Sequence, residues 1–153
     1  MPLLYVTLTP GVFNAAAKAK LVEALTEAAF VAESVPDLPA SRVRGLVLLQ
    51  ELPAGQFYSN SEPADGKLGG VFINYQLPAG VLDGARKAKF ARDLAAAVDL
   101  ALGQDRAYPV FTSAVIQEVT EGQWAQNGKI LRLPDNVSIT KFEHLVSMNE
   151  EVA

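Results

Sequence analysis

The sequence predicts an α/β (α+β) fold made of two tandem βαβ units, which form one four-stranded sheet with two helices on one face. Two observations carry this prediction. Residues 8–28 align without a gap on residues 77–97, and an apolar run precedes and follows each of these segments. A strand, a helix and a second strand in this order form a unit whose two strands run parallel. Two such units in one chain supply four strands and two helices.

The two aligned segments share a set of identical residues. In the numbering of the first segment they are Leu8, Gly11, Val12, Ala16, Lys18, Ala19, Lys20, Leu25 and Ala28. The match continues beyond the helices. The dipeptide QE at 50–51 corresponds to QE at 117–118, and GQF at 55–57 corresponds to GQW at 122–124. Chance likeness between two alanine-rich helices does not explain these later matches. We therefore interpret the two halves as a duplication.

The first unit begins with a strand at 3–8. This strand follows directly after Pro2, a residue that suits the first position of a strand. After a turn with proline and glycine, the side chain of Asn14 is a suitable acceptor for capping a helix. The apolar stripe of that helix consists of Leu21, Leu25 and Ala28. An apolar run at 43–50 predicts the second strand.

The second unit repeats this order. It has a strand at 71–77, a helix cap at Asp83 and a second strand at 109–119. The apolar stripe of its helix consists of Phe90, Leu94 and Ala97. Both second strands are apolar on both faces, so we expect Val47, Leu49 and Ile116 to expose apolar surface on the sheet face without helices. Such a surface predicts burial against other subunits.

The C-terminal part lies outside both units. Residues 140–151 predict a helix that contains His144, which we interpret as a surface or packing residue. We expect residues 134–153 to wrap a neighbouring subunit and to contribute little chemistry. In this division the chain is one domain over residues 1–153, with units at 2–66 and 70–128 and an extension at 129–153.

Composition narrows the classes of function. The chain has 153 residues, half of them hydrophobic, which is enough for one domain with a buried core. A net charge of −4 argues against nucleic acid or an anionic membrane surface as a partner. Without cysteine and with one histidine, thiolate chemistry and a multi-histidine metal site are excluded, and we expect no metal and no other cofactor. No apolar run is long enough to span a bilayer and no signal sequence is present, so we expect a cytoplasmic protein.

A duplicated βαβ unit that starts at Pro2, with Glu51, Gly55 and Phe57 spaced as Glu-x-x-x-Gly-x-aromatic after its second strand, resembles the tautomerase superfamily. The first half is similar to the 4-oxalocrotonate tautomerase subunit. The stretches PAGQFY and WAQNGKILRLP are similar to the fused-chain cis-3-chloroacrylic acid dehalogenase group. The resemblance covers about residues 2–134. It implies a homotrimer, and it implies removal of Met1, so that the secondary amine of Pro2 does the chemistry.

The chemistry of such an amine follows from its environment. An α-amino group has a pKa of about 7.7–8.0 in solution. Burial among apolar walls disfavours the ammonium form and lowers that pKa. A neutral amine can then act as a general base, or it can attack a carbonyl as a nucleophile. Val71, at the matching place of the second unit, has an amide nitrogen, so each chain carries at most one amine site.

The chain departs from the resemblance at charged positions. Where the resemblance implies arginines, this chain has Val12, Leu46, Ser113, Pro78 and Val81. The helical histidine of the dehalogenase group falls on Ala29, and its water-activating carboxylate falls on Gln126. Because a glutamine cannot take a proton from water, we do not expect hydrolytic dehalogenation.

Other residues are candidates for binding the substrate. They are Arg44, Asn74, Gln76, Trp124, Gln126, Asn127, Lys129 and Arg132. Arg44 lies within the predicted second strand, where it binds the substrate or forms a surface salt bridge. Lys129 and Arg132 either reach the mouth of the pocket or are solvated charges. Asn74 and Gln76 either bond a substrate carbonyl or satisfy backbone groups. Trp124 walls a pocket or belongs to the core or a subunit interface.

Taken together, these features predict an isomerase that uses Pro2 as general base on a small enol or 2-keto acid. One alternative is a trimeric ligand-binding or scaffold protein that has lost proline catalysis. Another is a decarboxylase or hydratase-type lyase of the same superfamily.

Overall fold

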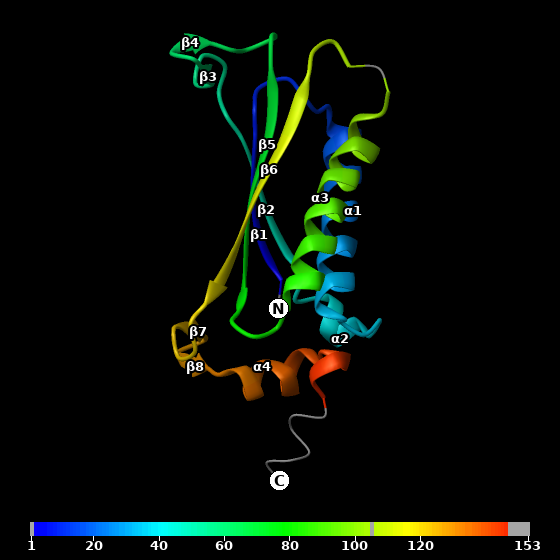
Figure 1. The fold of residues 1–153 in the computed structure, drawn as a ribbon, viewed down its shortest axis with the longest axis vertical. Helices are drawn as coiled ribbons and strands as arrows, with labels where there is room; N and C mark the ends of the chain where they lie inside the picture. Colours follow the sequence, from blue (N-terminus) through cyan, green and yellow to red (C-terminus); the bar gives the residue numbers. More distant parts are fainter. Residues whose placement is uncertain (1, 105, 147–153) are drawn as a thin grey trace.

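The computed structural model describes residues 2–104 and 106–146. Four strands form one sheet in the order β2-β1-β5-β6 (Figure 1). Their bounds are β1 Leu3–Leu8, β2 Leu46–Glu51, β5 Gly69–Pro78 and β6 Val110–Val119. Within each half the two strands are parallel, whereas β1 and β5 pair antiparallel at the centre of the sheet. The predicted fold class is therefore confirmed.

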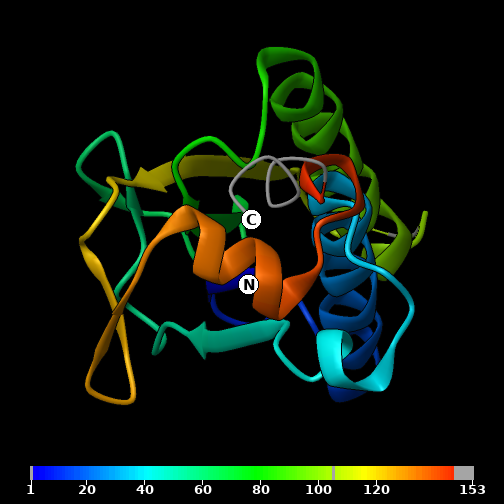
Figure 2. The same ribbon diagram turned by 90° about the horizontal axis from the view of Figure 1, so that it is seen from below.

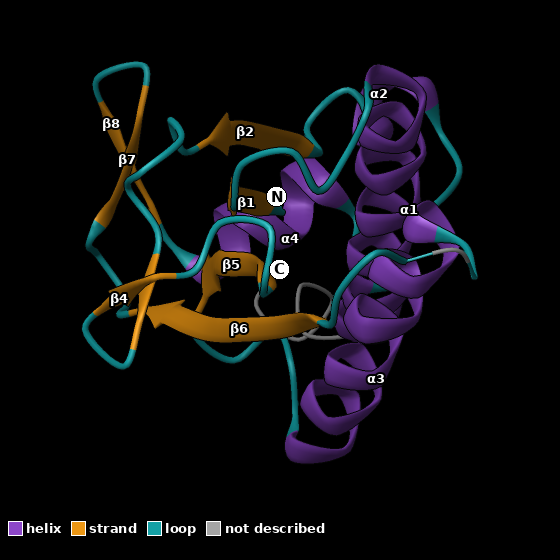
Figure 3. Ribbon diagram, turned by 90° about the horizontal axis from the view of Figure 1, so that it is seen from above, coloured by secondary structure: helices purple, strands orange, loops and turns teal. Residues whose placement is uncertain are grey.

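Two helices cover one face of this sheet (Figure 3). They are α1 (Ala15–Glu33) and α3 (Gly84–Leu102). Both predicted caps are present: the Ala17 amide donates to Asn14 Oδ1 at 2.9 Å, and the Arg86 amide donates to Asp83 Oδ1 at 2.8 Å. Each bond satisfies one of the free N–H groups at a helix start.

The core lies between the helices and the sheet. All six predicted stripe residues are buried there: Leu21, Leu25, Ala28, Phe90, Leu94 and Ala97. They meet the residues of β1 and β5 that point to the same side, which include Leu4, Val6, Leu8, Ile73 and Tyr75. Each fully buried large apolar side chain stabilises the fold by about 1.5–3 kcal/mol.

A charged contact ties the first helix to its second strand. Lys18 of α1 forms an ion pair with Glu51 at the end of β2, and the Gly11 amide donates to Glu51 Oε1 at 2.9 Å. The hydrogen bond from Lys18 and then that from Gly11 lower the pKa of Glu51 below its ordinary value. This contact fixes the turn before α1 against the end of the strand.

The second unit has the same contact at the corresponding positions. Lys87 Nζ lies 2.7 Å from Glu118 Oε2, and the Gly80 amide donates to Glu118 Oε1 at 3.5 Å. The hydrogen bond from Lys87 is the main cause of a lowered pKa of Glu118. The two halves thus share a contact between a lysine, a glutamate and a glycine as well as the order of their strands. This supports the interpretation of the sequence as a duplication.

The sheet face without helices exposes several apolar side chains, as expected, but the residues predicted to be exposed there were wrong. Leu46, Leu48 and Val115 expose 46%, 51% and 57% of their surface. Val47, Leu49 and Ile116 instead pack against the core on the helix side. A strand that is apolar on both sides does not indicate which set faces the helices, and a shift of one residue exchanges the two faces.

The segments that connect the strands contain short elements. A single turn of helix, α2 (Pro39–Arg42), precedes β2, which starts later than the predicted 43. One small hairpin consists of β3 (Tyr58–Ser59) and β4 (Glu62–Pro63). A second hairpin consists of β7 (Trp124–Gln126) and β8 (Lys129–Leu131).

The C-terminal segment differs from its prediction. Helix α4 (Leu133–Thr140) ends where the predicted helix would begin, because Lys141 is left-handed with φ of 57°. A 3₁₀ turn at Glu143–Leu145 follows, and the rest of the predicted helix lies outside the described residues.

This segment packs against its own chain. Helix α4 crosses the end of the sheet at which β1 begins (Figure 2). Val137 and Phe142 are buried in the chain's own core. Residues 134–146 therefore pack on their own chain, and their contact with a neighbouring subunit stays a prediction. Among the described helices, none has the length and apolar character that a membrane span requires.

Candidate functional site

Pro2 is buried at the point where β1 begins. Its carbonyl oxygen accepts a hydrogen bond from the Leu46 amide at 3.0 Å, so β2 holds this residue from one side. On the other side, the next residue, Leu3, pairs with Gln76 of β5. Pro2 therefore has a fixed place between two strands. Its role in catalysis stays a prediction.

A pocket of about 290 Å³ opens beside the start of β1. Its walls are formed by Leu3, Gln76, Val119, Gln123, Trp124, Ala125 and Gln126. Three predicted substrate-binding residues, Gln76, Trp124 and Gln126, thus share one pocket whose wall includes the neighbour of Pro2 in the chain. The hairpin of β7 and β8 supplies the aromatic side of this pocket. None of the described residues in its lining is charged.

A cluster of side-chain amides stands behind one wall of this pocket. Asn74 Nδ2 and Gln76 Nε2 both donate to Gln117 Oε1, at 3.3 Å and 3.1 Å. Asn74 Oδ1 is buried and has no hydrogen-bond partner among the described residues. Sequence reasoning missed Gln117 as a site residue. Gln117 lies directly opposite Gln76 in the pairing of β5 with β6, and the sequence pattern alone does not give this register.

Arg44 is not on the second strand. It lies in the turn before β2, where its amide donates to Ser41 O at 3.2 Å. Its Nε atom is buried without a hydrogen-bond partner, and no ion pair between described residues includes it. The predicted strand position was wrong because the short helix α2 delays the start of the strand.

The three remaining candidates belong to the hairpin and to the start of α4. Asn127 has a positive φ of 50° and the following glycine a φ of 78°, the Asn-Gly pattern of a tight hairpin turn. Lys129 is exposed and pairs across the hairpin with Gln126. Arg132 precedes α4, and its amide donates to Asp135 Oδ2 at 2.8 Å. None of Asn127, Lys129 and Arg132 lines the pocket beside Leu3.

A buried polar pair lies on the opposite side of the sheet from the amide cluster. The Tyr75 hydroxyl donates to Glu33 Oε1, and both side chains are fully buried. Burial raises the pKa of Tyr75 well above its ordinary value, and the charge of Glu33 acts in the same direction. Tyr75 pairs with Leu4, two residues after Pro2. Sequence reasoning missed this pair, because nothing in the pattern shows that a glutamate at the end of α1 turns inward.

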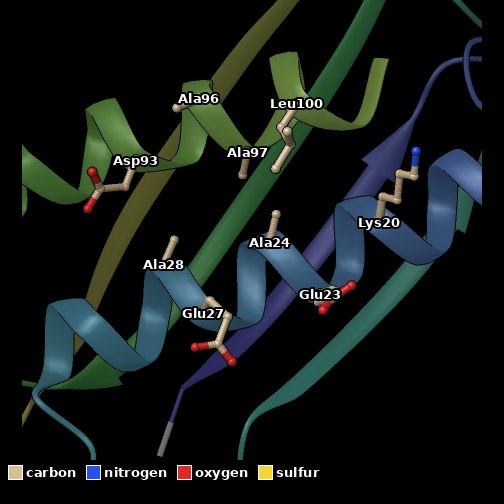
Figure 4. A pocket seen from close by; sticks show the side chains of 9 residues that line it. All are labelled: Lys20, Glu23, Ala24, Glu27, Ala28, Asp93, Ala96, Ala97 and Leu100. Atoms are coloured by element: carbon tan, nitrogen blue, oxygen red, sulfur yellow. The ribbon is translucent and has the colours of Figure 1, made fainter. Parts of the chain in front are cut away.

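A larger hollow lies between the two helices. It has a volume of about 630 Å³. Alanines of α1 and α3 point towards each other there, among them Ala24, Ala28 and Ala97 (Figure 4). Charged side chains such as Glu27 and Asp93 complete its lining. This groove contains none of the predicted site residues, so the smaller pocket beside Leu3 is the better candidate site.

Comparison with solved structures identifies the class of fold. A fused 4-OT, solved as a symmetric trimer, matches with a TM-score of 0.66 and 25% identity over 84% of this chain and 94% of that chain. A member of the cis-3-chloroacrylic acid dehalogenase family matches with a TM-score of 0.63 and 18% identity over 97% and 96% of the two chains. A probable enzyme from the thermophilic fungus Aspergillus fumigatus matches with a TM-score of 0.65 and 17% identity over 97% and 94%.

No protein-family model and no curated protein matches the sequence. The structural neighbours nevertheless agree with one another and cover most of the chain. The protein has the tautomerase-superfamily fold in its fused, two-unit form, and the resemblance predicted from the duplicated unit is confirmed.

Proposed function

We propose that the protein is an isomerase that needs no cofactor and interconverts the enol and keto forms of a small carbonyl compound. A 2-keto acid is the substrate that the resemblance to tautomerases suggests. The base is the secondary amine of Pro2, which becomes free when Met1 is removed. The observation that carries the proposal is the position of Pro2, buried at the start of β1 and one residue from a pocket lined by Leu3 and Trp124.

The reaction needs one group that moves a proton. The amine takes the proton of the enol hydroxyl and delivers it to the carbon next to the carbonyl, so that it ends each cycle in its starting state. Proton transfer by a positioned base contributes about 10²–10⁴-fold to the rate. Side-chain amides in the pocket wall, such as Gln76, stabilise the charge that develops on the substrate oxygen. Without a cationic clamp this stabilisation is weak, so turnover is slow.

The protein also acts as a homotrimer in this proposal. The support is the apolar sheet face, on which Leu46, Leu48 and Val115 are exposed in the single chain. Burying such a face against two further copies removes it from water. The fused 4-OT neighbour is a trimer.

The test is ketonisation of phenylenolpyruvate, followed by ultraviolet absorbance, with protein whose N-terminus has been verified by mass. We expect a rate above buffer that falls sharply in Pro2→Ala and in Pro2→Gly, because each variant has a primary amine in place of the secondary amine of proline. Pro53→Ala, which changes an exposed proline in a loop, is the matched control and leaves the rate unchanged. If correctly processed protein shows no rate above buffer, or if Pro2→Gly equals the wild type, the proline mechanism is wrong.

Covalent labelling gives an independent measurement. One structural neighbour was solved after inactivation by 2-oxo-3-pentynoate. We expect the same reagent to add once per chain, on Pro2, because the matching nitrogen of the second unit at Val71 is a backbone amide. Peptide mapping by mass spectrometry locates the adduct. An adduct on any other residue contradicts the proposed role of Pro2.

One observation favours a second candidate function. None of the predicted cationic residues Arg44, Lys129 and Arg132 lines the pocket. A trimeric protein that binds a ligand without converting it fits this pocket as well, and it is the outcome if the ketonisation test fails while ligands still bind. A hydratase-type lyase lacks comparable support, because Gln126 stands where the resemblance implies a water-activating carboxylate.

A further inference from the structure

The geometry points to an uncharged carbonyl compound, such as a ketone in its keto or enol form, as the ligand of the pocket beside Leu3. A carboxylate is disfavoured there. This inference rests on the proposed function, because it takes the pocket next to Pro2 to be the substrate site. It goes beyond that function because it replaces the 2-keto acid by a neutral substrate and identifies Gln76 as a specificity-determining residue.

The lining of the pocket carries the first step. Three of its side chains are amides, Gln76, Gln123 and Gln126, and the others are apolar. A carboxylate that enters such a wall loses its water and finds no opposite charge in the described lining. An uncharged carbonyl loses far less on leaving water, and a side-chain amide can offer it both a donor and an acceptor.

The hydrogen-bonding capacity of Gln76 carries the second step. Its amide nitrogen donates one hydrogen bond to Gln117 Oε1 at 3.1 Å, which leaves its second N–H and its oxygen for other partners. Gln117 Oε1 is held in place by a second donor, Asn74 Nδ2 at 3.3 Å. Gln76, which lines the pocket, therefore has one donor and one acceptor left for a ligand. An enol hydroxyl can use both, because it donates and accepts, whereas a carboxylate has only acceptors and can use the donor alone.

The nearby cations carry the third step, because they are used elsewhere or lie outside the pocket. Lys87 of α3 lies 2.7 Å from Glu118 at the end of β6 and is neutralised by it. Arg132 belongs to the start of α4 and does not line the pocket. Lys129 is the cation to examine, since it is exposed and lies across the hairpin from the lining residue Gln126.

Trp124 allows the inference to be tested by binding alone. It is the chain's one tryptophan and forms part of the pocket wall, so quenching of its fluorescence reports directly on this site. The ligands are 4-phenyl-2-butanone and 3-phenylpropanoate. They have the same shape, but the carbonyl carbon carries a methyl group in the first and a charged oxygen in the second. We expect the ketone to bind the processed, full-length protein with a Kd about tenfold lower than that of the carboxylate, because the carboxylate loses its hydration without meeting an opposite charge in the described lining.

Two substitutions sharpen this measurement. Gln76→Leu removes the side-chain amide, and we expect it to weaken binding of the ketone's hydroxyl analogue, 4-phenyl-2-butanol, about tenfold. Gln50→Leu, at an exposed glutamine of β2, is the control and leaves the Kd unchanged. Lys129→Gln leaves the binding of 4-phenyl-2-butanone and of 3-phenylpropanoate unchanged, because Lys129 does not line the pocket.

The outcomes separate this inference from the proposed function. Equal or tighter binding of the carboxylate, a Lys129→Gln variant that loses the carboxylate, or no quenching by either ligand overturns the inference. If the ketone is preferred but phenylenolpyruvate and its methyl ester are both not ketonised, the inference stands and the isomerase proposal fails. If phenylenolpyruvate and its methyl ester are ketonised with equal kcat/KM, the isomerase proposal stands and the inference fails.

Discussion

Tyr75 and Glu33 show how a single pair of side chains constrains the centre of the molecule. Both are fully buried, and the tyrosine hydroxyl donates to the carboxylate. A carboxylate kept away from water needs its hydrogen bonds more than an exposed one does. Because Tyr75 pairs with Leu4 in the sheet, this contact also fixes the strand that starts after Pro2.

The substitution Tyr75→Phe tests this pair. It keeps the ring, which lies 4.6 Å from the ring of Phe90 between centroids, and removes only the hydroxyl. We expect the free energy of unfolding to fall by about 1–3 kcal/mol at pH 7, because a buried acceptor loses one donor. Urea unfolding followed by circular dichroism measures the change. Tyr5→Phe, at a partly exposed tyrosine of the same sheet, is the control, and an equal loss there contradicts the assignment.

At the scale of elements, one repeated ion pair connects each helix with its second strand. The pKa values of Glu51 and Glu118 are both lowered, chiefly by the hydrogen bonds from Lys18 and Lys87. A carboxyl whose pKa is lower in the folded state contributes stability above its unfolded pKa. This contribution is lost as the pH falls through the folded pKa, so both units are weakened together in acid.

The substitution Glu118→Gln measures this contribution. We expect a loss of about 0.2–1 kcal/mol in the free energy of unfolding at pH 7, the range of partly exposed ion pairs. At a pH below the folded pKa of Glu118 the variant and the wild type should be equally stable. Urea unfolding at several pH values gives the comparison. Glu62→Gln, an exposed glutamate of β4, is the control and shows no such dependence. A loss that persists in acid contradicts the ion-pair explanation.

The elements themselves could be predicted from local patterns. Asn14 and Asp83 signal the helix starts, and the apolar stripes signal the faces that are buried, because cap chemistry and helical period act over a few residues. The outward face of β2 could not be predicted. Its residues Leu46 to Leu49 are all apolar, and only the pairing of Leu3 with Leu46 decides which of them meet the helices.

The candidate site could be predicted only in part for the same kind of reason. The resemblance and the strand order indicated Pro2, Gln76 and Trp124, and the structure brings the latter two into one pocket. Glu33 and Gln117 were missed because their contacts join segments that are far apart in sequence. Distances of this kind depend on the assembled sheet and leave no local signal.

At the scale of the whole molecule, the apolar sheet face sets the expected assembly. We expect sedimentation at micromolar concentration to show about three chains per particle. Leu48→Glu places a charge among the exposed apolar side chains of β2 and should shift the protein to single chains, because burying an unpaired carboxylate costs several kcal/mol. Val43→Glu, at a residue that is 74% exposed and precedes the sheet, is the control and should remain trimeric. A wild-type protein that sediments as a monomer contradicts the proposed assembly.

The antiparallel pairing of β1 with β5 joins two units that make different contributions to one pocket. The first unit provides Leu3, the residue that follows Pro2, whereas Gln76, Trp124 and Gln126 all belong to the second. In an assembly of identical single units, one sequence would have to make both contributions to the pocket. Every mutation would then change both contributions at once. In the fused chain each half evolves under its own constraint. New specificities can therefore arise by changes in the second half, while the half that carries the proline stays as it is.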